Sequence, residues 1–110
     1  MSKTKLKTPK DYQDYFEKVF AKTVIDTIKA ISDDEEYTEE DVRVETTYYF
    51  LNESTDYDAV AGMYIGYAGG NADRALQDFK DEIVDEPSER DRKVIEKLEQ
   101  IIALQNKKGN

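Results

Sequence analysis

"AVAGMYIGYAGG", residues 59–70, contains no charged side chain, although 37% of this 110-residue chain is Asp, Glu, Lys or Arg. Such a stretch suits a membrane span, a phosphate-binding loop or the buried part of a small domain. A membrane span needs about 18 or more apolar residues, and this stretch is shorter and rich in glycine. Its glycines also lack the spacing, and the following lysine, of the common phosphate-binding motifs. We therefore expect residues 59–70 to be buried.

The stretch fits two secondary structures. As a strand it would form a hairpin with residues 41–51, "DVRVETTYYFL", where β-branched and aromatic residues recur at every second position. As a helix it would have its cap in residues 54–55, its stop at Gly69, and an apolar stripe of Tyr57, Val60, Ala61, Tyr64, Ile65 and Ala68. Gly62 and Gly66 would each cost about 1 kcal/mol in a helix interior relative to alanine. Because Tyr, Ile and Val also prefer strands, we expect a strand whose glycines mark a close backbone approach.

Helices are predicted on both sides of this hairpin. Thr8 is a potential N-cap before Pro9, and apolar residues then recur at three- and four-residue steps to about residue 31. Asn71 is expected to cap a second helix, and a third spans about residues 89–106. The predicted fold is α+β in the order α-β-β-α-α, with the hairpin packed against the helices. An all-α bundle is the alternative if residues 54–68 are helical.

The domain organisation follows from length and charge. At 110 residues the chain suits one domain, because domains most often have about 100–150 residues. We expect a basic disordered tail at 1–8, a single acidic domain at 9–106 and a disordered C-terminus at 107–110. The basic start lacks the apolar stretch of a secretory signal, so a cytoplasmic protein is expected.

The composition excludes several kinds of chemistry. The chain has no Cys and no His, so it has no disulfide, no thiolate metal site and no imidazole base. Asp56 and Asp58 are close enough in sequence to bind a cation, but the residues after them lack the EF-hand pattern. Gly69-Gly70-Asn71 fits a tight turn and a helix cap. We predict no enzyme activity, no cofactor and no metal.

Charge is distributed unevenly. The net charge is −9; residues 33–58 hold eleven acids against Arg43 alone, whereas residues 1–10 hold four lysines and no acid. An acidic middle repels nucleic acid and membrane phosphates and attracts basic protein surfaces. Tyrosines lie among the acids, and tyrosine is a favoured anchor of protein interfaces. Tyr57, between two aspartates in a polar loop, is the expected exposed anchor. The predicted partner-binding residues are Glu39, Glu40, Asp41, Glu45, Glu53, Asp56, Tyr57 and Asp58.

In composition the chain resembles phage or mobile-element inhibitors that mimic nucleic acid, such as anti-restriction and anti-CRISPR proteins. The likeness rests on small size, acidity, basic ends and the lack of Cys and His, so it transfers no functional residue. It implies a non-enzymatic inhibitor that blocks a basic groove of a nucleic-acid-handling protein, as a monomer or weak homodimer. One alternative is an assembly protein that self-associates through Val94, Leu98, Ile101 and Gln105 of its last helix. The other is an immunity protein that neutralises a basic toxin.

Overall fold

The protein is all-helical. The computed structural model describes residues 6–31 and 36–108, which contain no strand. Their elements are α1 (Pro9–Ala30), α2 (Glu39–Asn52), α3 (Tyr57–Tyr67), α4 (Ala72–Asp81) and α5 (Glu89–Lys108). The α+β prediction with a hairpin is therefore wrong, and the all-α alternative describes the chain. Both predicted strands, 41–51 and 59–70, are helices or helix ends.

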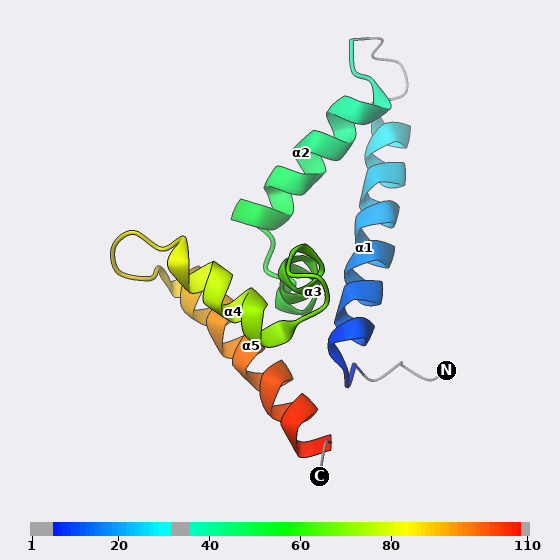
Figure 1. The fold of residues 1–110 in the computed structure, drawn as a ribbon. Helices are drawn as coiled ribbons and strands as arrows, with labels where there is room; N and C mark the ends of the chain where they lie inside the picture. Colours follow the sequence, from blue (N-terminus) through cyan, green and yellow to red (C-terminus); the bar gives the residue numbers. More distant parts are fainter. Residues whose placement is uncertain (1–5, 32–35, 109–110) are drawn as a thin grey trace.

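α3 lies at the centre of the molecule. Figure 1 shows it nearly end-on, with α1 on one side, the α4–α5 pair on the other and α2 above. Every residue from Ala59 to Ile65 is buried. A helix that is apolar all round is stable only where other elements cover it on every side. The predicted burial of residues 59–70 is confirmed for residues 59–65 and Ala68, while Gly66, Tyr67 and Gly69 are exposed. The element is a helix because helices, not a second strand, surround it.

Gly62 is the point of closest approach between α3 and α1. A Cβ atom built there would overlap the carbonyl oxygen of Tyr12 and lie 2.6 Å from its carbonyl carbon. Only a glycine lets the two backbones come this close. The predicted close backbone approach is thus confirmed at Gly62, within a helix pair. At Gly66 the nearest atom to such a Cβ is Nε2 of Gln13, at 3.6 Å, so that position has room for a side chain.

α2 forms because of its cap and its burial pattern. The Thr38 side chain accepts a hydrogen bond from the backbone N–H of Asp41, while the Asp41 carboxylate accepts one from the N–H of Thr38. This reciprocal capping box begins a helix. Val42, Thr46 and Phe50 are then buried at four-residue steps, which is the spacing of one helix face. The two-residue alternation suggested a strand because it included Val44 and Tyr48, which the structure exposes.

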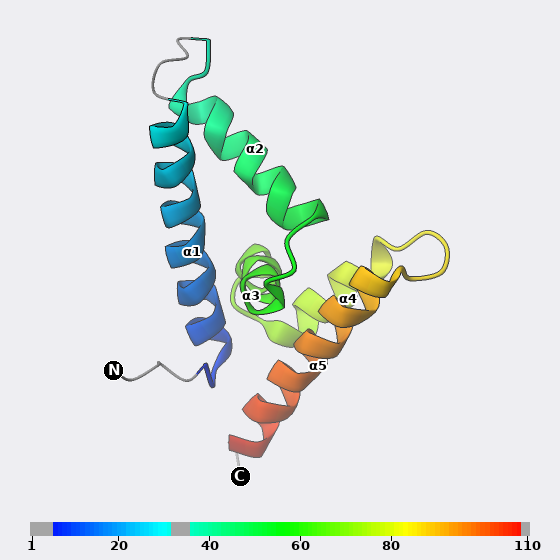
Figure 2. The same ribbon diagram turned by 180° about the vertical axis from the view of Figure 1, so that it is seen from behind.

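The starts of α1, α4 and α5 are the ones that the sequence predicts, whereas α3 is capped by Asp56 and not by residues 54–55. Thr8 caps α1 with Pro9 in its first turn, and Asn71 caps α4 by accepting the N–H of Arg74. Ser88 and Asp91 exchange backbone-to-side-chain hydrogen bonds at the start of α5. α4 and α5 form a hairpin against α3; seen from behind, α5 crosses in front of α4 (Figure 2).

Some predictions fall on the chain ends. Residues 1–5 of the expected tail, 109–110 of the expected C-terminus and 32–35 of the acidic linker lie outside the described residues. Leu6, which belongs to the expected tail, packs against the core. α5 continues to Lys108, two residues past its predicted end. Among the described residues no helix is both long and apolar enough to cross a membrane.

The α1–α3 contact predicts opposite effects for two identical substitutions. Gly62→Ala should destabilise the protein by about 2 kcal/mol or more, since overpacking costs about 1–3 kcal/mol and here the obstacle is backbone. Gly66→Ala should be neutral or stabilising by up to about 1 kcal/mol, because alanine is the better helix former. Urea unfolding of both variants measures the difference. Equal effects of the same sign would show that Gly62 is not the contact point.

Candidate functional site

α2 turns one side toward the protein and the other toward solvent. Its buried residues lie along the inner side, while Val44 and Tyr48, one turn apart on the opposite side, expose 46% and 58% of their surfaces. Tyr49 exposes 45% beside them. Contiguous apolar exposure marks an interaction site more often than a single exposed residue does. We call Glu40, Val44, Glu45, Tyr48 and Tyr49 the outer face of α2.

Free carboxylates flank these apolar side chains. Glu40 precedes Val44 by one turn and Glu45 follows it directly; Glu53 lies just beyond the end of the helix. Within residues 6–31 and 36–108, the carboxylates of these three glutamates have no hydrogen bond or ion pair. An exposed carboxylate without a partner keeps its full attraction for an incoming cation. The outer face therefore combines apolar contact area with negative charge.

The helix also carries a shallow hollow. An open depression of about 470 Å³ is lined by Glu39, Glu40, Arg43, Val44 and Thr47. Glu39 is engaged there, because its carboxylate accepts a hydrogen bond from Nε of Arg43 at 3.3 Å. This ion pair is exposed, and such a pair adds no more than about 1 kcal/mol to stability. A partner side chain can displace it at small cost.

Five of the predicted binding residues lie on this helix or at its end, and all are exposed: Glu39, Glu40, Asp41, Glu45 and Glu53. Asp41 has a structural task as well, since its carboxylate is part of the capping box of α2. The structure thus brings the acids of 39–53 together on one element.

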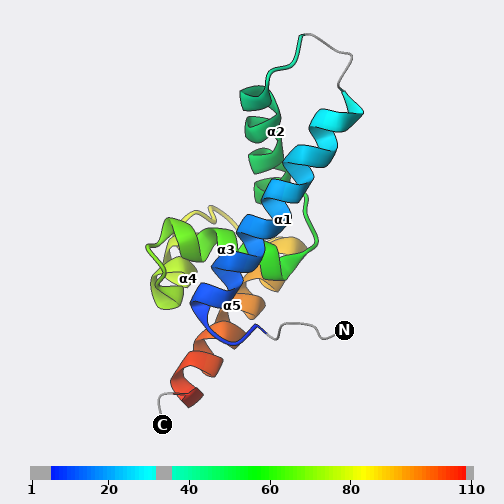
Figure 3. The same ribbon diagram turned by 90° about the vertical axis from the view of Figure 1, so that its right-hand side faces the viewer.

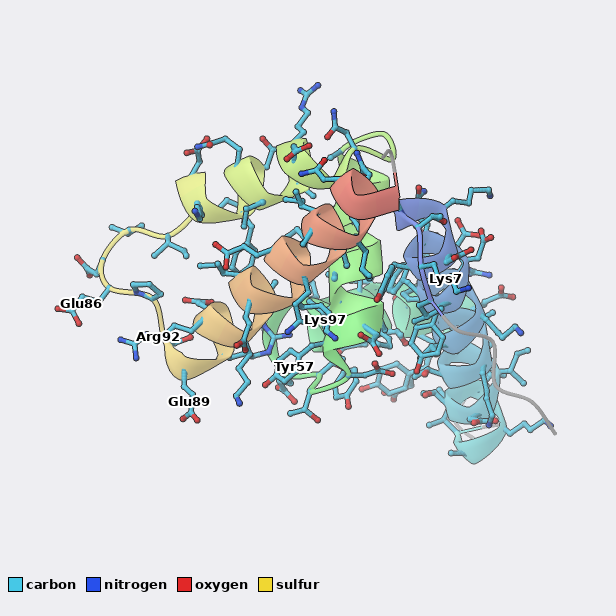
Figure 4. The ribbon with its side chains drawn as sticks, turned by 90° about the horizontal axis from the view of Figure 1, so that it is seen from below. Lys7, Tyr57, Glu86, Glu89, Arg92 and Lys97 are labelled. Carbon is cyan, nitrogen blue, oxygen red and sulfur yellow. The ribbon has the colours of Figure 1, made fainter. Side chains whose placement is uncertain are left out.

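The other three predicted residues hold the fold together. Asp56 caps α3, since its Oδ1 accepts a hydrogen bond from the backbone N–H of Ala59. Its Oδ2 accepts a second hydrogen bond from the hydroxyl of Tyr15, with an oxygen–oxygen distance of 2.8 Å. Nζ of Lys97 lies 2.9 Å from a carboxylate oxygen of Asp58. In Figure 4 Lys97 extends from α5 toward the start of α3, on the side where Tyr57 lies. These contacts tie the start of α3 to both α1 and α5.

Tyr57 is not the exposed ring that the sequence suggested. It is half-buried and packs against the core cluster. The polar neighbours Asp56 and Asp58 gave the impression of a solvated loop, but both are engaged in the contacts that start α3. The exposed aromatic residues on the acidic helix are Tyr48 and Tyr49 instead.

Sequence reasoning missed the outer face because it treated α2 as a strand. In a hairpin Tyr48 would share a face with Val42 and Phe50 and belong to the core. The pattern Thr38-x-x-Asp41 was the available signal, since it marks a helix start and a helix puts Val44 and Tyr48 opposite the buried stripe. No comparable signal marks Arg90, whose guanidinium donates to carbonyls at the end of α2.

Three of the four residues predicted to mediate self-association through the last helix are buried in the protein itself. Val94, Leu98 and Ile101 are each 0% exposed, because they fill the protein's own core. Only Gln105 of the predicted set is exposed. A second copy could reach these three apolar residues only by unpacking α5 from α3 and α4, so self-association would have to use other residues of α5.

Three tyrosines are held in their neutral form. The hydrogen bond to Asp56 raises the pKa of Tyr15 to about 12. Burial raises the pKa of Tyr64 to about 12, and burial also raises the pKa of Tyr12. A nucleophile or general base needs the opposite shift in a hydroxyl. Within the described residues no group of three Asp or Glu is placed to hold a metal ion.

The tyrosine shifts predict a loss of stability at high pH. The pKa of Tyr15 in the folded protein, about 12, lies above its value of about 10 in an unfolded chain. Its contribution is therefore complete below about pH 10 and disappears as the pH rises through about 12. Asp56→Asn should lower the pKa of Tyr15 while keeping a good helix cap.

Ultraviolet titration of tyrosinate, with Tyr15→Phe to identify the transition, measures this pKa. Loss of one high-pH transition in Tyr15→Phe, and its movement to lower pH in Asp56→Asn, are the expected results. An unchanged titration curve in both variants would contradict the assigned hydrogen bond.

The chain was also compared with known proteins. No protein-family model, no curated protein and no solved structure matches it.

Proposed function

We propose that the protein is a non-enzymatic binding protein that docks the outer face of α2 on a basic groove of a nucleic-acid-handling protein. The observation that carries the proposal is the pairing of exposed Val44, Tyr48 and Tyr49 with the carboxylates of Glu40 and Glu45 on the outer face of α2. These two carboxylates have no hydrogen bond or ion pair to any residue that the structure describes. Aromatic anchors supply most of the binding energy at protein interfaces, and charges around them steer association and select partners.

The sign and extent of the charge support a partner that normally holds nucleic acid. Residues 36–53 contain six acids against Arg43, and residues 73–86 contain six acids against two bases. The acids of both stretches are exposed. Duplex DNA presents one negative charge per about 1.7 Å of its axis. A groove built to attract such a charge density attracts this surface too, while nucleic acid itself is repelled.

A basic toxin neutralised by an immunity protein would meet the same charges. Competition at physiological salt separates the two partners, because a groove built for nucleic acid still binds duplex DNA there, whereas non-specific binding of DNA to a basic surface is weak. The proposal requires such competition. It also requires that the free protein does not itself bind duplex DNA.

Tyr48 and Tyr67 form a matched pair for testing the docking face. Both are exposed, at 58% and 65%, but Tyr67 ends α3 on another part of the surface. Tyr48→Ala should weaken partner binding by about 2 kcal/mol or more, mainly through faster dissociation. Tyr67→Ala should leave binding unchanged, and both variants should keep their stability within about 0.5 kcal/mol.

The measurement begins with capture on the immobilised protein from a lysate of the source organism at low salt. Bound proteins are eluted with duplex DNA and identified, and the affinity of the purified partner is then measured by surface plasmon resonance for both variants. If no captured protein is displaced by duplex DNA, the proposed class of partner is contradicted. Equal losses in the two variants would contradict the docking face.

A further inference from the structure

We infer that Arg90 is a positioning residue that sets the direction of α2, and with it the direction of the outer face, relative to α3, α4 and α5. Its importance for binding rests on the function proposed above, whereas the positioning itself can be tested without a partner. Arg90 lies in the first turn of α5, about forty residues after the segment that it contacts.

The guanidinium of Arg90 uses all three of its nitrogens on one target. Nη2 donates to the carbonyl oxygen of Phe50 at 2.8 Å, Nη1 to that of Leu51 at 2.9 Å and Nε to that of Ser54 at 3.2 Å. These carbonyls belong to the last turn of α2 and the loop after it. Because the guanidinium is planar and rigid, three hydrogen bonds from it fix the relative orientation of the three carbonyls. A single hydrogen bond from a flexible side chain would not do this.

The end of α2 needs a cation from elsewhere. The last carbonyls of a helix lack partners inside it and carry the negative end of its dipole. The last turn of α2 has no basic residue, and its C-cap residue is the acidic Glu53. Arg90 supplies the missing donors and the missing positive charge from another helix.

The remaining attachment of α2 at this end is apolar. Phe50 is 1% exposed, and its ring centre lies 5.4 Å from that of Phe16 and 6.1 Å from that of Phe20. The burial of apolar surface that holds Phe50 there is not directional. Figure 3 shows α2 and the adjoining part of α1 projecting from the body that contains α3, α4 and α5. The inner stripe of α2 packs on α1, and the hydrogen bonds of Arg90 fix the direction of this projecting helix relative to α5.

Spin labels measure this direction in the full chain. The chain has no cysteine, so Glu45→Cys on α2 and Glu99→Cys on α5 give one specifically labelled pair; both positions are exposed. A second pair, Lys18→Cys on α1 with Glu99→Cys, serves as the reference for the body. Distance distributions from pulsed electron paramagnetic resonance are compared in the unsubstituted background, Arg90→Gln, Arg90→Lys and Arg92→Gln.

Arg92→Gln is the matched control, since it removes the same charge from an exposed side chain that lies near the α4–α5 loop (Figure 4). Arg90→Gln should broaden and shift the α2–α5 distribution while the α1–α5 distribution stays narrow. Arg90→Lys should restore the narrow α2–α5 distribution in part, because the lysine ammonium keeps the positive charge but lacks the planar guanidinium with its several donors. Arg92→Gln should change neither distribution.

An unchanged α2–α5 distribution in folded Arg90→Gln would overturn the inference, and so would equal broadening of both pairs. If Arg90→Gln does not fold, Arg90→Lys decides by the same comparison. The proposed function fails separately, by the absence of a DNA-displaceable partner for the unsubstituted protein. The positioning role of Arg90 can therefore be confirmed or contradicted independently of the proposed function.

Discussion

The closeness of two backbones at Gly62 is the constraint on which the structure depends. α3 can be covered on all sides only if α1 crosses it without a side chain between them, and a Cβ at Gly62 would meet the carbonyl of Tyr12. Phe16 packs against the same position. Once α1 and α3 are in contact, the α4–α5 hairpin covers the opposite side of α3. The uncharged stretch is therefore the core of the molecule, although it has the length of one short helix.

A core formed around α3 leaves α2 with little to bury. Its inner stripe of Val42, Thr46 and Phe50 suffices to attach it, and the rest of its surface is free for another purpose. The acids that would repel one another in a compact interior lie there in water. Val44 and Tyr48 expose apolar surface that the fold does not use. The proposed binding role rests on this division between a neutral centre and an acidic projecting helix.

The sequence predicted burial better than it predicted secondary structure. The starts of α1, α4 and α5 follow from local chemistry at Thr8, Asn71 and Ser88, and the structure confirms them. Burial was predicted for residues 59–70 and holds for residues 59–65 and Ala68, whereas Gly66, Tyr67 and Gly69 are exposed. A strand was expected because helix propensity includes the cost of a glycine at position 62 but not the close helix packing that this glycine permits. The exposed acids of α2 follow from composition, whereas the roles of Asp56, Asp58 and Arg90 depend on contacts between helices that no local pattern contains.

Native-state hydrogen exchange of the backbone amides tests the central place of α3 most directly. Amides of a fully buried central helix exchange only through global unfolding, while those of a projecting helix open locally. The amides of residues 60–66 should give the highest free energies of exchange in the chain, equal to the unfolding free energy from urea. The amides of residues 43–49 in α2 should give lower values. Faster exchange in α3 than in α2 would contradict a fold organised around the contact at Gly62.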